Sequence, residues 1–185
     1  MAKPREDGMI LKILKDLDSN YGSKLQRLQL SGAARLALSL SAHSGDAFFV
    51  FPLVFVLWWL GTPRLRTIAV LLAAGIVLSL IFTYIIKFSV RRPRPPGEWG
   101  QFYRRTDPYS FPSGHAAKTM AIAVVFMGCH SWWAGVLMLH WSALVGFART
   151  ALGVHYLSDI TVGYVIGLAA GTAVCLFELF SGFSL

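Results

Sequence analysis

Long uncharged stretches alternate with short charged ones along this chain of 185 residues. Residues 68–86 and 160–177 carry no charge, and each is long enough to cross a hydrocarbon layer about 30 Å thick. Residues 119–148 are also uncharged but are too long for one upright span, so residues 128–133 in their middle indicate the turn of a helical hairpin. Residues 48–60 form the shortest predicted span. The pattern predicts an all-α integral-membrane bundle of about five transmembrane helices.

The N-terminal region has a different, amphipathic pattern. Ile10, Ile13, Leu14 and Leu17 follow helical i, i+3, i+4, i+7 spacing with charged residues between them. This spacing predicts a helix in the membrane interface, and an ordinary surface helix packed on the bundle is an equally compatible interpretation. Residues 33–42 are too short to span and are expected to continue this interfacial part. The predicted division is therefore an interfacial segment, 1–45, followed by a membrane domain, 46–185.

Composition supports the membrane assignment. Hydrophobic residues make up 55% of the chain and the mean hydropathy is +0.57, which is too apolar for a typical soluble domain. The net charge is +8, but the basic residues flank the predicted spans, so anionic headgroups are a better partner than nucleic acid. Cys129 and Cys175 lie near or inside spans, where we expect packing thiols rather than a disulfide.

If successive spans cross the membrane in opposite directions, four span ends lie on one face of the membrane. These ends carry Lys87, Arg94, His115, Arg149, His155 and Asp159. Polar side chains at the ends of apolar spans are costly and are typical of functional sites. The long connection between the second and third spans adds four further arginines, which we interpret as snorkelling interfacial residues: Arg91, Arg92, Arg104 and Arg105.

These residue types fit phosphoryl transfer. Lys87, Arg94 and Arg149 supply cations for phosphate oxygens, and arginine offers a planar fork of donors. Ser113 and Gly114 stand at the start of a predicted helix, whose free N–H groups bind anions. His155 and Asp159 are four residues apart on one helix face, so the carboxylate can orient the imidazole as a nucleophile.

His115 is a second imidazole, able to protonate a leaving oxygen. Carboxylates are scarce on this face, with only Glu98 and Asp107 in the loop besides Asp159, so we expect no metal and no cofactor.

Three motifs spaced over residues 87–159 resemble the signature of the type 2 phosphatidic acid phosphatase superfamily. They are Lys87 with Arg94-Pro95 after six intervening residues, then Pro112-Ser113-Gly114-His115, then Arg149, His155 and Asp159 separated by five and three residues. The one departure is Ala148, where the family often has serine. The stretch 91–115 also resembles, more loosely, the small branch that acts on presqualene and polyprenyl diphosphates.

The resemblance implies a metal-independent membrane lipid phosphatase with an active-site loop at residues 88–113 in a phosphatase domain, 46–185. His155 would form a phosphohistidine, Asp159 would orient it and His115 would protonate the leaving group. The phosphate would be held by Lys87, Arg94, Ser113, Gly114 and Arg149. The implied substrates are isoprenoid diphosphates or glycerophospholipid phosphates.

Two other classes of function remain open at this stage. One is a phosphotransferase or soluble phosphate-ester hydrolase with the same site, and the other is a catalytically silent lipid-binding or scaffold protein. Relatives that oxidise halides with bound vanadate share these motifs, but the apolarity of this chain argues against that activity. The sequence specifies no oligomeric state.

The distribution of basic residues predicts the orientation of the site. The N-terminus and the active face share one side, which carries most of the lysines and arginines, whereas the loops of the other side carry only Arg64 and Arg66. The positive-inside rule therefore favours a cytoplasmic site. Several members of the resembled family work on the outer face, which is an argument in the opposite direction.

Overall fold

The computed structural model describes residues 9–26, 28, 31–96 and 107–182. Its helical elements, in chain order, are α1 (Met9–Leu17), η1 (Asp18–Gly22), α2 (Ser23–Gln26), α3 (Gly32–Ser44), α4 (Ala47–Leu60), α5 (Pro63–Val90), α7 (Gly114–Val125), η2 (Phe126–His130), α8 (Trp132–Ala151) and α9 (Leu157–Ser181). In these described segments the only β pairing is an isolated bridge between Pro93 and Tyr109. The all-α prediction is confirmed.

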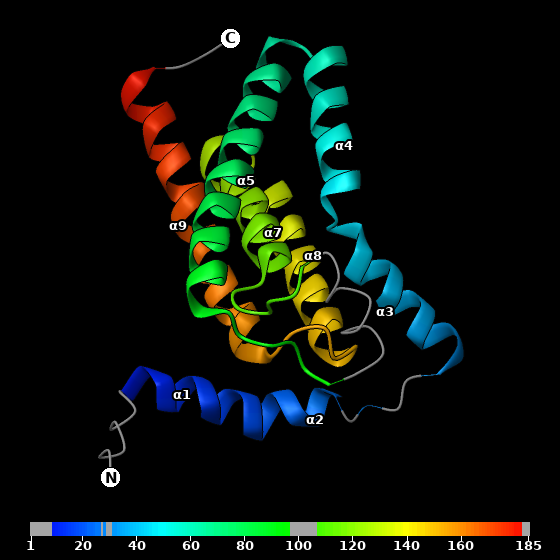
Figure 1. Cartoon of the computed structure of the whole chain (residues 1–185). Coiled ribbons are helices and arrows are strands. Elements are labelled where there is room, and N and C mark those ends of the chain that lie inside the picture. Colours follow the sequence, from blue (N-terminus) through cyan, green and yellow to red (C-terminus); the bar gives the residue numbers. More distant parts are fainter. Residues whose placement is uncertain (1–8, 27, 29–30, 97–106, 183–185) are drawn as a thin grey trace.

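The long helices form a bundle, and the N-terminal segment lies across one of its ends. In Figure 1, α7 runs between α5, α8 and α9, while α4 stands beside α8 and α5. The segment α1–η1–α2 runs crosswise beneath the bundle, near the start of α9 and the end of α8. The C-terminal end of α9 lies at the opposite end of the bundle. An interfacial position suits this segment, since Ile13, Tyr21 and Leu28 are exposed.

Two helices, α5 and α9, are each long and apolar enough to cross a membrane. A third crossing forms if α3 and α4 count as one span, bent by 56° at the break between them. The expected interfacial helix at 33–42 is thus the first half of this bent pair. The count of five crossings and the domain boundary at residue 45 stay predictions.

The predicted hairpin is confirmed by a change of direction between η2 and α8. The helix from Gly114 continues as η2 to His130, and α8 starts at Trp132 after the extended residue Ser131. The prediction of two thiols is wrong, because Cys175 is disulfide-bonded and no free cysteine occurs in the described part of the chain.

Close packing of α7 against α9 determines where the functional ends of both helices lie. Gly163, Gly167 and Gly171 follow one another at four-residue spacing on α9. A Cβ at Gly163 would lie 2.6 Å from the Ser113 carbonyl oxygen, and one at Gly167 would collide with the Ala117 carbonyl oxygen. Small residues at this spacing allow two membrane helices to approach backbone to backbone. The start of α7 is thereby held beside the start of α9, where the Ser113 N–H donates to the Asp159 carbonyl oxygen at 3.0 Å.

We predict that Gly167→Ala destabilises the bundle. The added methyl group has no room against Ala117, and overpacking of this kind costs roughly 1–3 kcal/mol. Thermal unfolding of the purified chain in detergent measures the loss.

Gly75→Ala is the matched control, because its Cβ would meet Val125 Cγ2 at 3.4 Å, an ordinary contact. Equal melting temperatures for the two variants would contradict the packing argument.

Candidate active site

The six polar residues expected at one face are brought together at the end of the bundle nearest α1 and α2. Lys87 lies in the last turn of α5 and Arg149 in the last turn of α8. Ser113 is the N-cap of α7, with His115 in the first turn of that helix. His155 precedes α9, and Asp159 lies in its first turn.

His155 and Asp159 form a buried pair. Their side chains are 2% and 0% exposed, and His155 Nδ1 faces Asp159 Oδ2 at 3.4 Å. The backbone N–H of Tyr156 donates to the same oxygen at 2.9 Å, which orients the carboxylate. Burial lowers the pKa of His155 to about 4, against the opposing effect of Asp159. The imidazole is therefore neutral at physiological pH, as a nitrogen nucleophile must be.

Arg94 and Lys87 converge on one carboxylate from the loop. Asp107 Oδ2 accepts from Lys87 Nζ at 2.6 Å and from Arg94 Nη2 at 2.8 Å. Arg94 Nη1 also lies 3.2 Å from His155 Nε2, the nitrogen opposite Asp159. Arg94 thus links the Asp107 carboxylate, which Lys87 also contacts, to the Nε2 atom of His155.

His115 and Arg149 converge on a second carboxylate. Asp46 Oδ1 lies 2.5 Å from His115 Nε2 and 3.0 Å from Arg149 Nη2, and His115 and Arg149 are themselves in direct contact. Asp46 comes from the bend between α3 and α4. The site therefore depends on a segment outside the three motifs.

The cations of the site are almost completely buried. Lys87 is 2% exposed, Arg94 4% and Arg149 1%. Buried charges are costly unless they are compensated, and Asp46 and Asp107 supply the compensation in this structure. Within the described residues no group of three or more His, Cys, Asp or Glu side chains could hold a metal ion.

Ser113 and Gly114 occupy the position expected of them, at the N-terminus of α7. Ser113 Oγ accepts a long hydrogen bond from the Ala116 N–H at 3.4 Å. Its side chain is fully buried. The first N–H groups of a helix have no intrahelical acceptor and can bind an anion.

Three functional candidates were missed by the sequence analysis: Asp46, Arg92 and Asp18. The snorkelling interpretation of Arg92 is wrong, because Arg92 Nη1 donates to Asp159 Oδ1 at 2.9 Å. Arg91 is exposed, and Arg104 and Arg105 lie outside the described residues. Asp46 carried one signal in the sequence, since it is the single acidic residue between Asp18 and Glu98.

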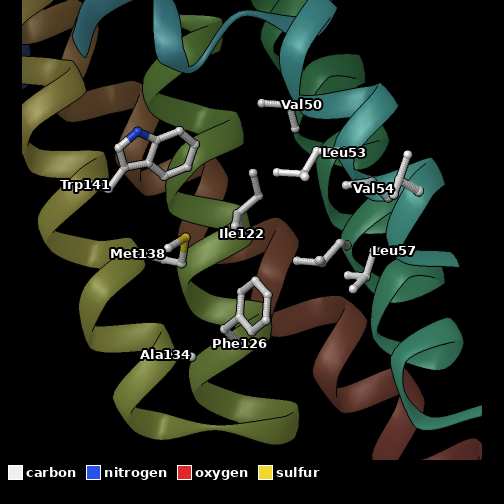
Figure 2. Close-up of a pocket in the computed structure, with 11 residues that line it drawn as sticks. Val50, Leu53, Val54, Leu57, Ile122, Phe126, Ala134, Met138 and Trp141 are labelled. Carbon is white, nitrogen blue, oxygen red and sulfur yellow. The ribbon is translucent and has the colours of Figure 1, made fainter. Parts of the chain in front are cut away.

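An apolar groove opens one helical turn away from Asp46. It has a volume of about 640 Å³ and lies between α4, α5, α7 and α8. Figure 2 shows Val50 and Leu57 of α4 facing Met138 and Trp141 of α8 across it. Trp141 Nε1 donates to Ser44 Oγ at 2.8 Å, which ties one end of the groove to the bend beside Asp46.

Comparison with known proteins identifies the family of this chain. Residues 68–181 match the PAP2 superfamily. The decaprenylphosphoryl-5-phosphoribose phosphatase of Mycobacterium tuberculosis is 31% identical over 134 residues, covering 72% of this chain and 74% of that protein. The undecaprenyl-diphosphatase of Sulfolobus acidocaldarius is 29% identical over 108 residues, covering 56% and 52%. The chain spans about half the length of that protein and 64% of Escherichia coli YbjG.

A solved structure shares the fold. The transmembrane PAP2-type phosphatidylglycerolphosphate phosphatase of Bacillus subtilis superposes with a TM-score of 0.73 at 20% identity, covering 91% of this chain and 87% of that one. The family match extends over more than half of the chain and includes all three motifs. The chain belongs to the PAP2 superfamily.

Proposed function

We propose that this chain is an integral-membrane lipid phosphate phosphatase that releases phosphate through a phosphohistidine. The observation that carries the proposal is the convergence of three buried cations and two histidines at one end of the bundle, beside an apolar groove. Cations suit the oxygens of a phosphoryl group, and the two imidazoles suit the attacking and leaving ends of an in-line transfer. The groove suits the lipid part of the substrate.

In the proposed first step, His155 Nε2 attacks phosphorus while Asp159 holds the opposite nitrogen. An N–P bond forms as the P–O bond to the leaving group breaks, and His115 gives its proton to the leaving oxygen. Lys87, Arg94 and Arg149, with the Ser113 hydroxyl and the backbone N–H of Gly114, stabilise the charge on the equatorial oxygens. Water then attacks the phosphorus atom, and a P–O bond forms as the N–P bond to His155 breaks. His115 takes up a proton from that water, and inorganic phosphate leaves.

Substrate phosphate competes with two internal anions in this proposal. Asp107 accepts from Lys87 and Arg94, and Asp46 accepts from Arg149. A phosphate group needs the same donors, so the carboxylates exchange places with it when substrate binds.

The proposed substrate class is an isoprenoid phosphate or diphosphate, with glycerophospholipid phosphates as the second class. Two observations support this order. The groove is lined by apolar side chains along its length, and the Mycobacterium tuberculosis and Sulfolobus acidocaldarius relatives carry the names of polyprenyl-lipid phosphatases.

The proposed site faces the cytoplasm. The basic N-terminal segment lies at the same end of the bundle as the site, and the positive-inside rule places such segments in the cytoplasm. Cys175 lies near the opposite end of α9 and is disulfide-bonded, which suits an oxidising compartment on that side.

The first test is His155→Ala, which removes the proposed nucleophile. We expect phosphate release from undecaprenyl diphosphate in detergent to fall by at least about a thousandfold, because no other group replaces the attacking nitrogen. His140→Ala is the matched control, since His140 is exposed on α8 and, within the described residues, bonds only to the Val136 carbonyl oxygen. Activity within tenfold of the parent would reject His155 as the nucleophile.

The groove is tested with Ala134→Phe, which fills part of it from α8. We expect kcat/KM for undecaprenyl diphosphate to fall by roughly tenfold, because the tail loses its apolar contacts, while hydrolysis of a short water-soluble phosphate ester stays unchanged. Ala74→Phe, on the exposed side of α5, is the matched control and should spare both substrates. Equal losses for the two substrates would show that the groove does not bind the tail.

Orientation is tested with single cysteines at Gly97 and Thr62, introduced after replacing Cys129 and Cys175. In intact cells, a membrane-impermeant thiol reagent should label position 62 and not position 97. The reverse pattern would place the site on the outer face.

A further inference from the structure

The carboxylate of Asp18, in the N-terminal segment, makes three hydrogen bonds at the catalytic end of the bundle. Asp18 Oδ1 accepts from the backbone N–H of Ser158 at 2.8 Å. Asp18 Oδ2 accepts from Ser158 Oγ at 2.7 Å and from Arg92 Nη2 at 2.7 Å. The Asp18 side chain is 12% exposed, although it belongs to a segment whose other side chains are largely exposed. An aspartate buried to this extent against a helix start acts as a specific anchor.

Arg92 continues this contact to the catalytic pair. Its Nη1 donates to Ser158 Oγ at 2.7 Å and to Asp159 Oδ1 at 2.9 Å, while its guanidinium lies 3.8 Å from the centre of the Tyr156 ring. The two terminal nitrogens of one planar group therefore hold two carboxylates at a fixed separation. Lysine has one terminal nitrogen on a flexible stem and cannot reproduce this fixed planar geometry.

The packing around Asp18 shows that the segment is seated against α9. A Cβ at Gly22, one turn after Asp18, would lie 3.4 Å from Leu157 Cβ, so the two backbones approach closely. Figure 1 shows the segment lying across the start of α9. The Asp18 anchor therefore joins an amphipathic segment of the membrane surface to the first turn of the helix that carries Asp159.

We infer that Asp18 is a positioning residue that holds the Asp159–His155 pair through Arg92 and Ser158; this inference rests on the proposed phosphatase function. Asp159 Oδ2 faces His155 and the Tyr156 N–H, and Arg92 holds Oδ1. The charge of Asp18 balances Arg92. Without Asp18, the Arg92 guanidinium pairs more closely with Asp159 and draws that carboxylate away from His155. The His155 ring then loses its orientation, and its charged form loses the stabilisation that Asp159 provides.

The test compares Asp18→Asn with Asp16→Asn in the full chain purified in detergent, with undecaprenyl diphosphate as the probe. Asp16 is exposed on the same segment, and its side chain makes no hydrogen bond or ion pair with the described part of the chain, so its variant should keep kcat within twofold. For Asp18→Asn we expect kcat to fall by roughly tenfold, the effect typical of losing an outer partner of a catalytic group, with KM within twofold. Size-exclusion chromatography and melting temperature measure the folded fraction, to which kcat is referred.

A double-mutant cycle separates positioning from simple anchoring. Arg92→Lys should also lower kcat, and the double variant should be no slower than the slower single variant, because both changes break one chain of contacts. If Asp18→Asn does not fold, Ser158→Ala decides instead, since it removes the hydroxyl that Asp18 and Arg92 share.

An unchanged kcat in the folded Asp18→Asn or Ser158→Ala variant, or an equal loss in Asp16→Asn, overturns the inference. Absence of activity in the parent chain would instead reject the proposed function.

Discussion

Three cationic side chains buried at one end of an apolar bundle are the constraint on which the rest of this structure depends. Lys87, Arg94 and Arg149 are each at most 4% exposed. Buried ions lose hydration worth several kcal/mol each, which nearby opposite charges must offset. Asp107 compensates the first two and Asp46 the third. The loop after α5 and the bend before α4 therefore have their positions set by electrostatics as much as by packing.

The apolar part of the molecule determines that these charges meet at all. The glycines of α9 let α7 approach backbone to backbone, which brings Ser113 within hydrogen-bond distance of the Asp159 backbone. Since His115 follows Ser113 by two residues, the same contact places the two histidines at one end of the bundle. The packing of α7 on α9 therefore determines how the two histidines are placed at the end of the bundle.

Much of this arrangement could be predicted from the sequence. Uncharged runs and the alternation of crossings were enough to bring Lys87, His115 and Asp159 to one end, because a membrane span has few alternatives to a straight helix. The hairpin before Trp132 was predicted for the same reason. That α3 and α4 together are long and apolar enough for one bent span was not predicted, because each half alone is too short to be recognised as a span.

The contacts of Asp18, Asp46 and Arg92 could not be predicted from the sequence. Asp46 lies 69 residues from His115 and Asp18 lies 74 residues from Arg92, and no periodic pattern links positions so far apart. The position of Arg92 beside a predicted span favoured an interfacial environment, since an arginine at such a place usually reaches toward lipid headgroups. The disulfide of Cys175 was missed because a cysteine in an apolar helix has the same sequence signature whether oxidised or reduced.

Asp46 and Asp107 have a further consequence for how substrate enters the proposed site. Because both carboxylates already neutralise the cations, binding of a lipid phosphate is an exchange of anions rather than the capture of one. The cost of removing the cations from water is met once, when the chain folds. In the proposed function, each turnover then replaces the two carboxylates with a phosphate group, which limits the change in the net charge of the site. The groove begins one turn beyond Asp46. In the proposed function, the bend at Asp46 therefore separates the cation site, which binds the phosphate, from the groove, which binds the lipid tail.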